Sequence, residues 1–163
     1  MNESDPPNRT PPPVSLSFLV SQFGAHAAQS FARALRALDL RPQDAGLLRM
    51  LSVRPGMTQV ETSETFGVLP SRLVALLDAL ETRGLVRRAR DAEDRRKVRL
   101  FLTDDGRKAA RAIAALTEAM DEGLFRALGK DQRAMLAGLL SKLVEAQGLQ
   151  PGVHPAYRDN AED

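Results

Sequence analysis

The chain contains no cysteine and only two histidines among its 163 residues. The absence of cysteine excludes disulfides, thiolate zinc sites, catalytic thiols and redox sensing by a thiol. Two histidines make a histidine-ligated metal site unexpected, and we expect no cofactor. The sequence shows no phosphate-binding loop, no nucleophile paired with a base and no group of metal ligands. We therefore do not expect an enzyme.

Long apolar runs are also missing. No segment approaches the roughly 20 apolar residues that a membrane-spanning helix requires, and the proline-rich N-terminus lacks the basic-then-apolar order of a signal peptide. We therefore expect a cytoplasmic protein with no membrane partner. At 43% hydrophobic residues, the chain is long enough and apolar enough to bury a core.

Net charge is small, but positive charge is concentrated in one region. The formal net charge is only +2, yet nine of the 23 lysines and arginines lie between Pro70 and Arg99. A local basic group on a nearly neutral protein is typical of a surface that binds nucleic acid.

The basic region spans one helix and one β-hairpin. Apolar residues recur at helical spacing from 69 to 80, and Gly84 is expected to end this helix. The period then changes to two, which predicts a strand with Val98, Leu100 and Leu102 on one side. The residues that form the predicted buried face of the helix are Leu69, Leu73, Leu76, Leu77 and Leu80.

Short helices precede this unit and long helices flank it. Residues 15–38 carry a helical apolar stripe, and a second helix is expected after Pro42. Thr58 and Glu61 have the spacing of a capping box, which opens a short third helix. After the hairpin, Thr103 is a candidate N-cap for a long helix that is followed by another. Two short helices, a turn and a further helix give helix-turn-helix order.

We predict an α+β, mostly helical fold: a winged helix-turn-helix whose N- and C-terminal helices form a dimerisation platform. The apolar stripes of the terminal helices are too extensive for one small domain to cover, so we expect a homodimer. The predicted organisation is a disordered tail at 1–14, a dimerisation helix at 15–40, a DNA-binding lobe at 41–103, dimerisation helices at 104–148, and a C-terminal tail at 149–163 that is either loose or an arm over a neighbour.

Two segments around the hairpin resemble the MarR family of winged helix-turn-helix regulators. Residues 91–96 (DAEDRR) and 100–107 (LFLTDDGR) follow the family pattern of the wing, with Ala92 in place of the usual proline. The resemblance implies a bacterial transcription regulator, a repressor, that binds a pseudo-palindromic operator on double-stranded DNA as a homodimer. It also implies release by a small aromatic or phenolic ligand.

The chain departs from the family pattern at two places. Val74 and Ala75 stand at recognition-helix positions that are often polar. We therefore expect this helix to make few hydrogen bonds to DNA bases. Thr62 and Ser63 stand where leucine and alanine are usual, and we expect their hydroxyls to bond to carbonyls one turn back.

We expect DNA contacts from the start of the recognition helix and from the hairpin. Arginine at a hairpin tip has a physical target in the narrow minor groove of A·T-rich DNA. Asp94 is expected to orient a neighbouring arginine rather than touch DNA. The alternative is that the hairpin arginines only protect an exposed strand edge. The candidate DNA-binding residues are Ser71, Arg72, Val74, Ala75, Arg88, Arg90, Arg95, Arg96 and Lys97.

The layout of the family places a ligand where dimerisation helices meet the DNA-binding lobe. Phe23, His26 and Met50 are the residues that we expect to line such a site, although His26 is also consistent with an ordinary surface histidine. A different class of function stays open: a helical protein-interaction module on the same scaffold, with weak or no specific DNA binding.

Overall fold

The computed structural model describes residues 14–157. The element order confirms the predicted arrangement of helix-turn-helix, hairpin and flanking helices. The predicted tail at 1–14 lies outside the described residues except for Val14, and so does the chain after Tyr157. The elements are α1 (Leu16–Leu35), the 3-10 helix η1 (Arg36–Leu38), α2 (Pro42–Val53), α3 (Gln59–Phe66), α4 (Pro70–Thr82), β1 (Val86–Arg90), β2 (Val98–Leu102), α5 (Asp104–Leu124), α6 (Lys130–Ala146) and the 3-10 helix η2 (Pro155–Tyr157).

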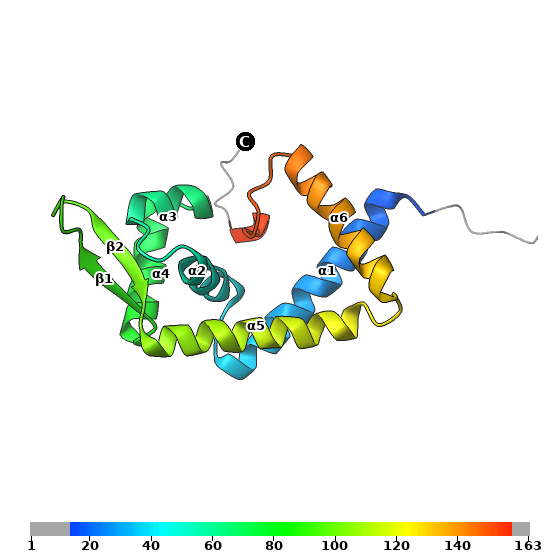
Figure 1. Ribbon diagram of the computed structural model, residues 1–163, viewed down its shortest axis with the longest axis horizontal. Coiled ribbons are helices and arrows are strands. Elements are labelled where there is room, and N and C mark those ends of the chain that lie inside the picture. The colour runs from blue at the N-terminus through cyan, green and yellow to red at the C-terminus, as the bar shows by residue number, and fades with distance from the viewer. Residues whose placement is uncertain (1–13, 158–163) are drawn as a thin grey trace, which may run out of the picture.

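The long helix α5 joins two parts of the molecule (Figure 1). At one end α2, α3, α4 and the hairpin form the winged lobe, residues 42–102. At the other end α5 lies with α1 and α6. Because α5 packs against α2, β2 and α1 and runs from the hairpin to the turn before α6, it sets the distance between the winged lobe and α6. No helix in residues 14–157 is long and apolar enough to cross a membrane.

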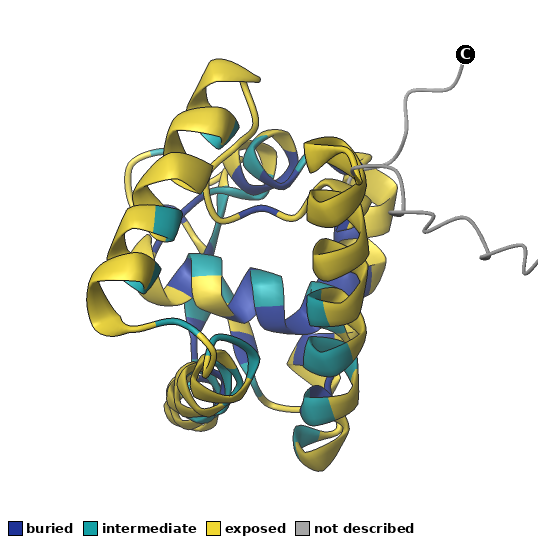
Figure 2. Ribbon diagram, turned by 90° about the vertical axis from the view of Figure 1, so that its right-hand side faces the viewer, coloured by how far each residue is buried: buried dark blue, intermediate teal, exposed yellow. Residues whose placement is uncertain are grey.

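The hydrophobic core lies inside the winged lobe, where Figure 2 shows most of the buried residues. The predicted buried face of α4 is confirmed for Leu73, Leu76, Leu77 and Leu80. Leu69 is 61% exposed, because it precedes α4 as its N-cap residue. The largest fully buried side chains are Phe66, Leu35, Leu47, Leu48, Leu51, Leu73, Leu77, Leu80 and Leu100.

Side-chain caps fix where α3 and α5 begin. The Thr58 hydroxyl accepts a hydrogen bond from the Glu61 amide at 3.2 Å, and the Glu61 carboxylate accepts one from the Thr58 amide at 2.7 Å. This confirms the predicted capping box. The Thr103 hydroxyl accepts from the Gly106 amide at 2.9 Å, which confirms the predicted N-cap of α5.

The two hydroxyls in α3 behave differently from each other. Thr62 donates to the Thr58 carbonyl at 2.7 Å, as expected. The expectation is wrong for Ser63, which donates to the Val68 carbonyl at 2.7 Å. The reason is that Gly67, with φ 69°, turns the chain and brings Val68 back over the end of α3. Ser63 therefore holds the turn between α3 and α4.

The outer helices expose their apolar faces. Leu16 is 73% exposed, α1 buries only Leu35, and α6 buries none of its residues. Figure 2 shows these helices as largely exposed. Uncovered apolar faces of this length are typical of surfaces that bind another protein. The exposed apolar residues of the two helices are Leu16, Phe18, Leu19, Val20, Phe23, Met135, Leu139, Leu140 and Leu143.

The segment after α6 folds back onto the winged lobe, which Figure 1 shows in red beside α2. We call residues 149–157 the C-terminal arm. Val153 and Tyr157 are each only 9% exposed, and the Tyr157 ring stacks on the Phe66 ring at a centroid distance of 5.5 Å. This part of the predicted tail is therefore not loose, because an aromatic ring anchors it to its own chain.

Candidate DNA-binding surface

The exposed face of α4 is anchored from behind. Leu73, Leu76 and Leu77 hold the helix in the core, so the opposite face is turned to solvent. Pro70 at the first helical position presets the backbone for this start. The predicted contact residues on α4 are all exposed: Ser71, Arg72, Val74 and Ala75.

The hairpin beside α4 presents basic residues at its tip. Its strands pair in antiparallel register from Val86 with Leu102 to Arg90 with Val98. The tip therefore spans residues 91–97, beyond the end of the paired strands. The exposed basic residues of the hairpin include Arg90, Arg95, Arg96 and Lys97.

A buried carboxylate holds the tip in shape. Asp91 is 6% exposed and its side chain accepts hydrogen bonds from the amides of Glu93 at 2.8 Å and Asp94 at 2.9 Å. It also pairs with Arg99. Hydrogen bonds from the Asp94 amide, the Arg99 guanidinium and the Glu93 amide lower the pKa of the Asp91 carboxyl to about 2. Asp91 therefore stays ionised at neutral pH and fixes the turn.

Sequence reasoning missed Asp91 and assigned the orienting role to Asp94 alone. The sequence pattern that indicates this role is an aspartate at the first position of a short polar loop. Its side chain can accept hydrogen bonds from the backbone amides two and three residues later. Asp94 does contact an arginine: its Oδ1 accepts from the Arg96 amide and from Arg96 Nε, both at 3.1 Å. These hydrogen bonds lower the pKa of Asp94. The Arg96 side chain itself is 90% exposed.

Arg99 ties the hairpin to the loop after α2. Its Nη1 donates to the Gly56 carbonyl at 2.9 Å, while its Nε pairs with Asp91. Thr58 and Arg99 also form an isolated antiparallel bridge. The angle of the hairpin is therefore fixed from two sides.

Arg88 does not have the position that we expected of a DNA contact. Its Nη1 lies 2.6 Å from Asp78 Oδ1 and 2.7 Å from Glu81 Oε2, and its side chain is 23% exposed. The reason is strand alternation, since Arg88 shares a face with buried Val86 and so points at α4. A guanidinium shared by two carboxylates is not available to a phosphate. We therefore remove Arg88 from the predicted contacts and infer that it clamps β1 to α4.

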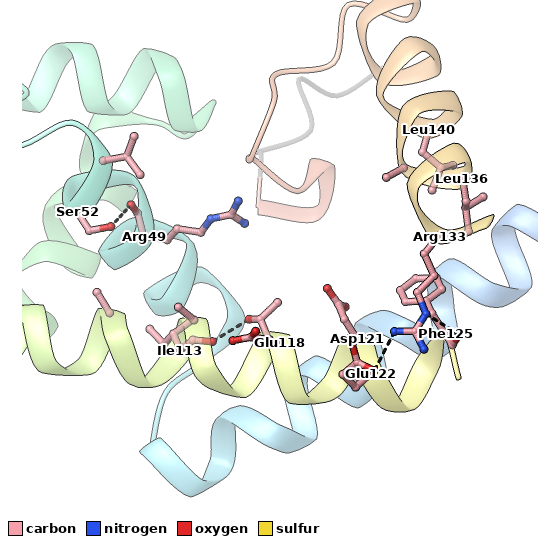
Figure 3. Close-up of a pocket in the computed structure, with 15 residues that line it drawn as sticks. Arg49, Ser52, Ile113, Glu118, Asp121, Glu122, Phe125, Arg133, Leu136 and Leu140 are labelled. Carbon is pink, nitrogen blue, oxygen red and sulfur yellow. Dashed lines mark hydrogen bonds and ion pairs between the residues drawn. The ribbon is translucent and has the colours of Figure 1, made fainter. Parts of the chain in front are cut away.

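A cleft of about 860 Å³ lies between the winged lobe, α5 and α6. Figure 3 shows Arg49 reaching into it from α2, with Asp121 and Glu122 on α5, Phe125 just after α5, and Arg133 on α6. Arg133 pairs with Glu122 at 2.9 Å, whereas Arg49 has no ion-pair partner among residues 14–157.

The predicted ligand residues do not line this cleft. Phe23, His26 and Met50 are absent from its wall, and their role in binding a ligand stays a prediction. Only Phe23 comes near, because its ring lies 5.3 Å from the ring of Phe125. His26 is exposed on α1, and Met50 packs against the core of the winged lobe.

Helix-turn-helix, a recognition helix and a basic two-stranded wing define a winged helix-turn-helix protein. The family model described as MarR family matches residues 38–97. The chain is 30% identical over 128 residues to the HTH-type transcriptional repressor Rv2887 of Mycobacterium tuberculosis, covering 78% of this chain and 92% of that protein. The protein belongs to the MarR family.

Solved structures agree with this assignment. The transcriptional repressor CouR bound to a 23-mer DNA duplex matches with a TM-score of 0.72 and 32% identity, over 80% of this chain and 92% of that one. The Mycobacterium tuberculosis MarR family protein Rv2887 in complex with p-aminosalicylic acid matches with a TM-score of 0.65 and 28% identity, over 80% and 98%.

Proposed function

We propose that this protein is a homodimeric transcriptional repressor that binds a pseudo-palindromic operator and is released by a small aromatic ligand. The observation that carries the proposal is the exposed basic tip of the hairpin, which Asp91 and Asp94 hold in shape beside the exposed face of α4. The DNA-bound CouR structure supports the assignment, because it has the same fold over most of this chain.

In the proposed complex the two surfaces have different tasks. The start of α4 enters the major groove, where Ser71 and Arg72 contact base edges or phosphates. Val74 and Ala75 offer only apolar contacts, such as to a thymine methyl group. Arg95 and Arg96 enter the adjacent minor groove, while Arg90 and Lys97 neutralise phosphates.

DNA selected from a random pool by the full-length protein tests this function. We expect enrichment of a two-fold symmetric sequence with half-sites about one helical turn apart. Affinity for it should fall steeply with salt, because each neutralised phosphate releases counterions. Binding with no symmetric sequence, or with a flat salt response, would instead favour the protein-interaction module.

The homodimer is proposed to form through the exposed apolar faces of α1 and α6. An obligate interface buries about 2,000 Å² or more in total, and light scattering at micromolar concentration should give twice the chain mass. Leu139→Glu should shift the mass toward the monomer, because it places a charge in the apolar stripe of α6. Ser141→Glu, on the opposite side of the same helix, is the control and should stay dimeric. A monomeric wild-type protein would contradict the proposal.

The proposed ligand site is the cleft beside Arg49. An apolar wall that includes Ile113, Leu136 and Leu140 lies beside the Arg49 guanidinium, which has no ion-pair partner among residues 14–157. This combination fits an aromatic ring that carries a carboxylate or phenol. The Rv2887 complex with p-aminosalicylic acid is a relative that holds a molecule of this class. A ligand that binds most tightly at one distance between the winged lobe and α6 would hold the lobe there. It would thereby change the spacing between the α4 helices of the two protomers.

Titration of salicylate-type compounds with and without operator tests ligand release. A coupling of about 1–3 kcal/mol lowers DNA affinity by roughly 5- to 150-fold, and DNA must lower ligand affinity by the same factor. Arg49→Gln should weaken ligand binding, whereas Arg126→Gln, which removes a charge outside the cleft, should not. Equal ligand affinity with and without operator would reject release.

A further inference from the structure

Tyr157 is seated in a notch on the winged lobe. Its ring stacks on Phe66, one of the largest fully buried side chains of the core. The other wall of the notch is Gly46, in the middle of α2. A Cβ at residue 46 would lie 2.8 Å from Tyr157 Cε2 and 3.3 Å from Phe66 Cε2. The ring of Tyr157 can therefore lie this close to α2 only because residue 46 has no side chain.

The backbone gives no other reason for glycine at this position. Gly46 lies within α2 and is not among the residues of positive φ. Glycine inside a helix is destabilising relative to alanine. Glycine at residue 46 thus destabilises α2, but it leaves space for the ring of Tyr157.

The C-terminal arm gives the winged lobe a second connection to α6. The first is α5, which runs from the hairpin to the turn before α6. The arm leaves the far end of α6 and returns to α2 and α3 (Figure 1). The residues that line the cleft come from α2, α5, α6 and the turn between α5 and α6, and Figure 3 shows the arm passing near Arg49.

We propose that the C-terminal arm is a strap that fixes the winged lobe relative to α6, with Tyr157 and Gly46 as positioning residues for operator binding. This inference rests on the proposed function. A two-fold operator requires both recognition helices at one spacing, and apparent affinity falls by the fraction of molecules that have that spacing. The docked arm narrows the range of lobe positions and so raises that fraction.

Arm docking has a direct optical readout. Tyr157 is the only tyrosine, and the chain has no tryptophan. Burial raises the pKa of the Tyr157 phenol above its ordinary value of 10.0, and ultraviolet absorbance of the tyrosinate reports this single group in the full-length protein. We expect a raised pKa in the wild type and an ordinary one in Gly46→Ala. An ordinary pKa in the wild type would overturn docking.

Gly123→Ala is the matched control. It makes the same change inside a helix, but the added Cβ has nothing within 4 Å, so the pKa of Tyr157 should stay raised. Tyr157→Ala is the second arm variant, which releases the arm without adding an atom to the core.

The strap is then measured without DNA. The absence of cysteine allows Glu64→Cys on α3 and Ala134→Cys on α6 to carry the only two spin labels, with excess unlabelled protein restricting the signal to distances within one chain. We expect a narrow distance distribution in the wild-type background and in Gly123→Ala. Gly46→Ala and Tyr157→Ala should both broaden it, and an unchanged width in both would overturn the strap.

Operator affinity completes the test. Both arm variants should bind the selected operator about fivefold or more weakly than the wild type, at unchanged dimer mass. Unchanged or tighter binding would overturn the positioning role. Failure of the wild type to bind any operator would contradict the proposed function instead, while the distance measurement would still decide whether the strap exists.

Discussion

Replacing Gly106 with alanine is expected to lower the free energy of unfolding by about 3 kcal/mol or more, the upper range for overpacking in a site that cannot relax. A Cβ at residue 106 would lie 1.9 Å from the Leu85 carbonyl oxygen and 2.9 Å from its carbon. Both atoms belong to the backbone, so no side-chain rotation relieves the overlap. The start of α5 must separate from the base of the hairpin.

The surrounding hydrogen bonds resist that separation. The Thr103 amide donates to the Leu85 carbonyl at 3.1 Å, and the Thr103 hydroxyl donates to the Gly84 carbonyl at 2.6 Å. Moving α5 away breaks these bonds and removes the N-cap that Thr103 gives to the Gly106 amide. Urea denaturation followed by circular dichroism measures the loss. Gly123→Ala, which meets no atom within 4 Å, should be neutral or stabilising, and equal stability of the two variants would contradict this account.

The elements were predictable because their apolar spacing and caps are local properties of the sequence. The helical stripe that ends at Leu80, the alternation from Val98 to Leu102 and the capping box at Thr58 need no knowledge of tertiary structure. The exposed outer faces of α1 and α6 also follow from the sequence, since their stripes exceed what the winged lobe can cover.

Contacts between distant segments were not predictable in the same way. Arg88 looks like its neighbouring arginines in the sequence, and only strand alternation against α4 makes it a clamp. The cleft beside Arg49 was not predictable for a similar reason, because it depends on which faces of α2, α5 and α6 meet. Tyr157 reaches Phe66 across most of the chain, and nothing local to either residue indicates the pair.

The double variant Arg95→Ala/Arg96→Ala is expected to weaken operator binding while leaving the fold intact. Loss of one groove contact costs about 1–3 kcal/mol, or roughly 5- to 150-fold in affinity, and two arginines on one tip should cost more than one. The fold should survive because both side chains are exposed, and the turn is held by Asp91 and Arg99 instead.

Removing two positive charges anywhere on the protein also weakens its attraction to DNA, so the control must remove two positive charges elsewhere. Arg126→Ala/Lys130→Ala does this in the turn before α6 and at the start of α6, away from the hairpin, α4 and the apolar face of α6. If Arg95 and Arg96 release counterions at the DNA, their loss should lower the slope of log affinity against log salt by about 2, close to one unit for each contact. The control should leave that slope unchanged. Equal losses in the two double variants would mean that the wing acts only through net charge, and the contact to DNA would then lie on α4 alone.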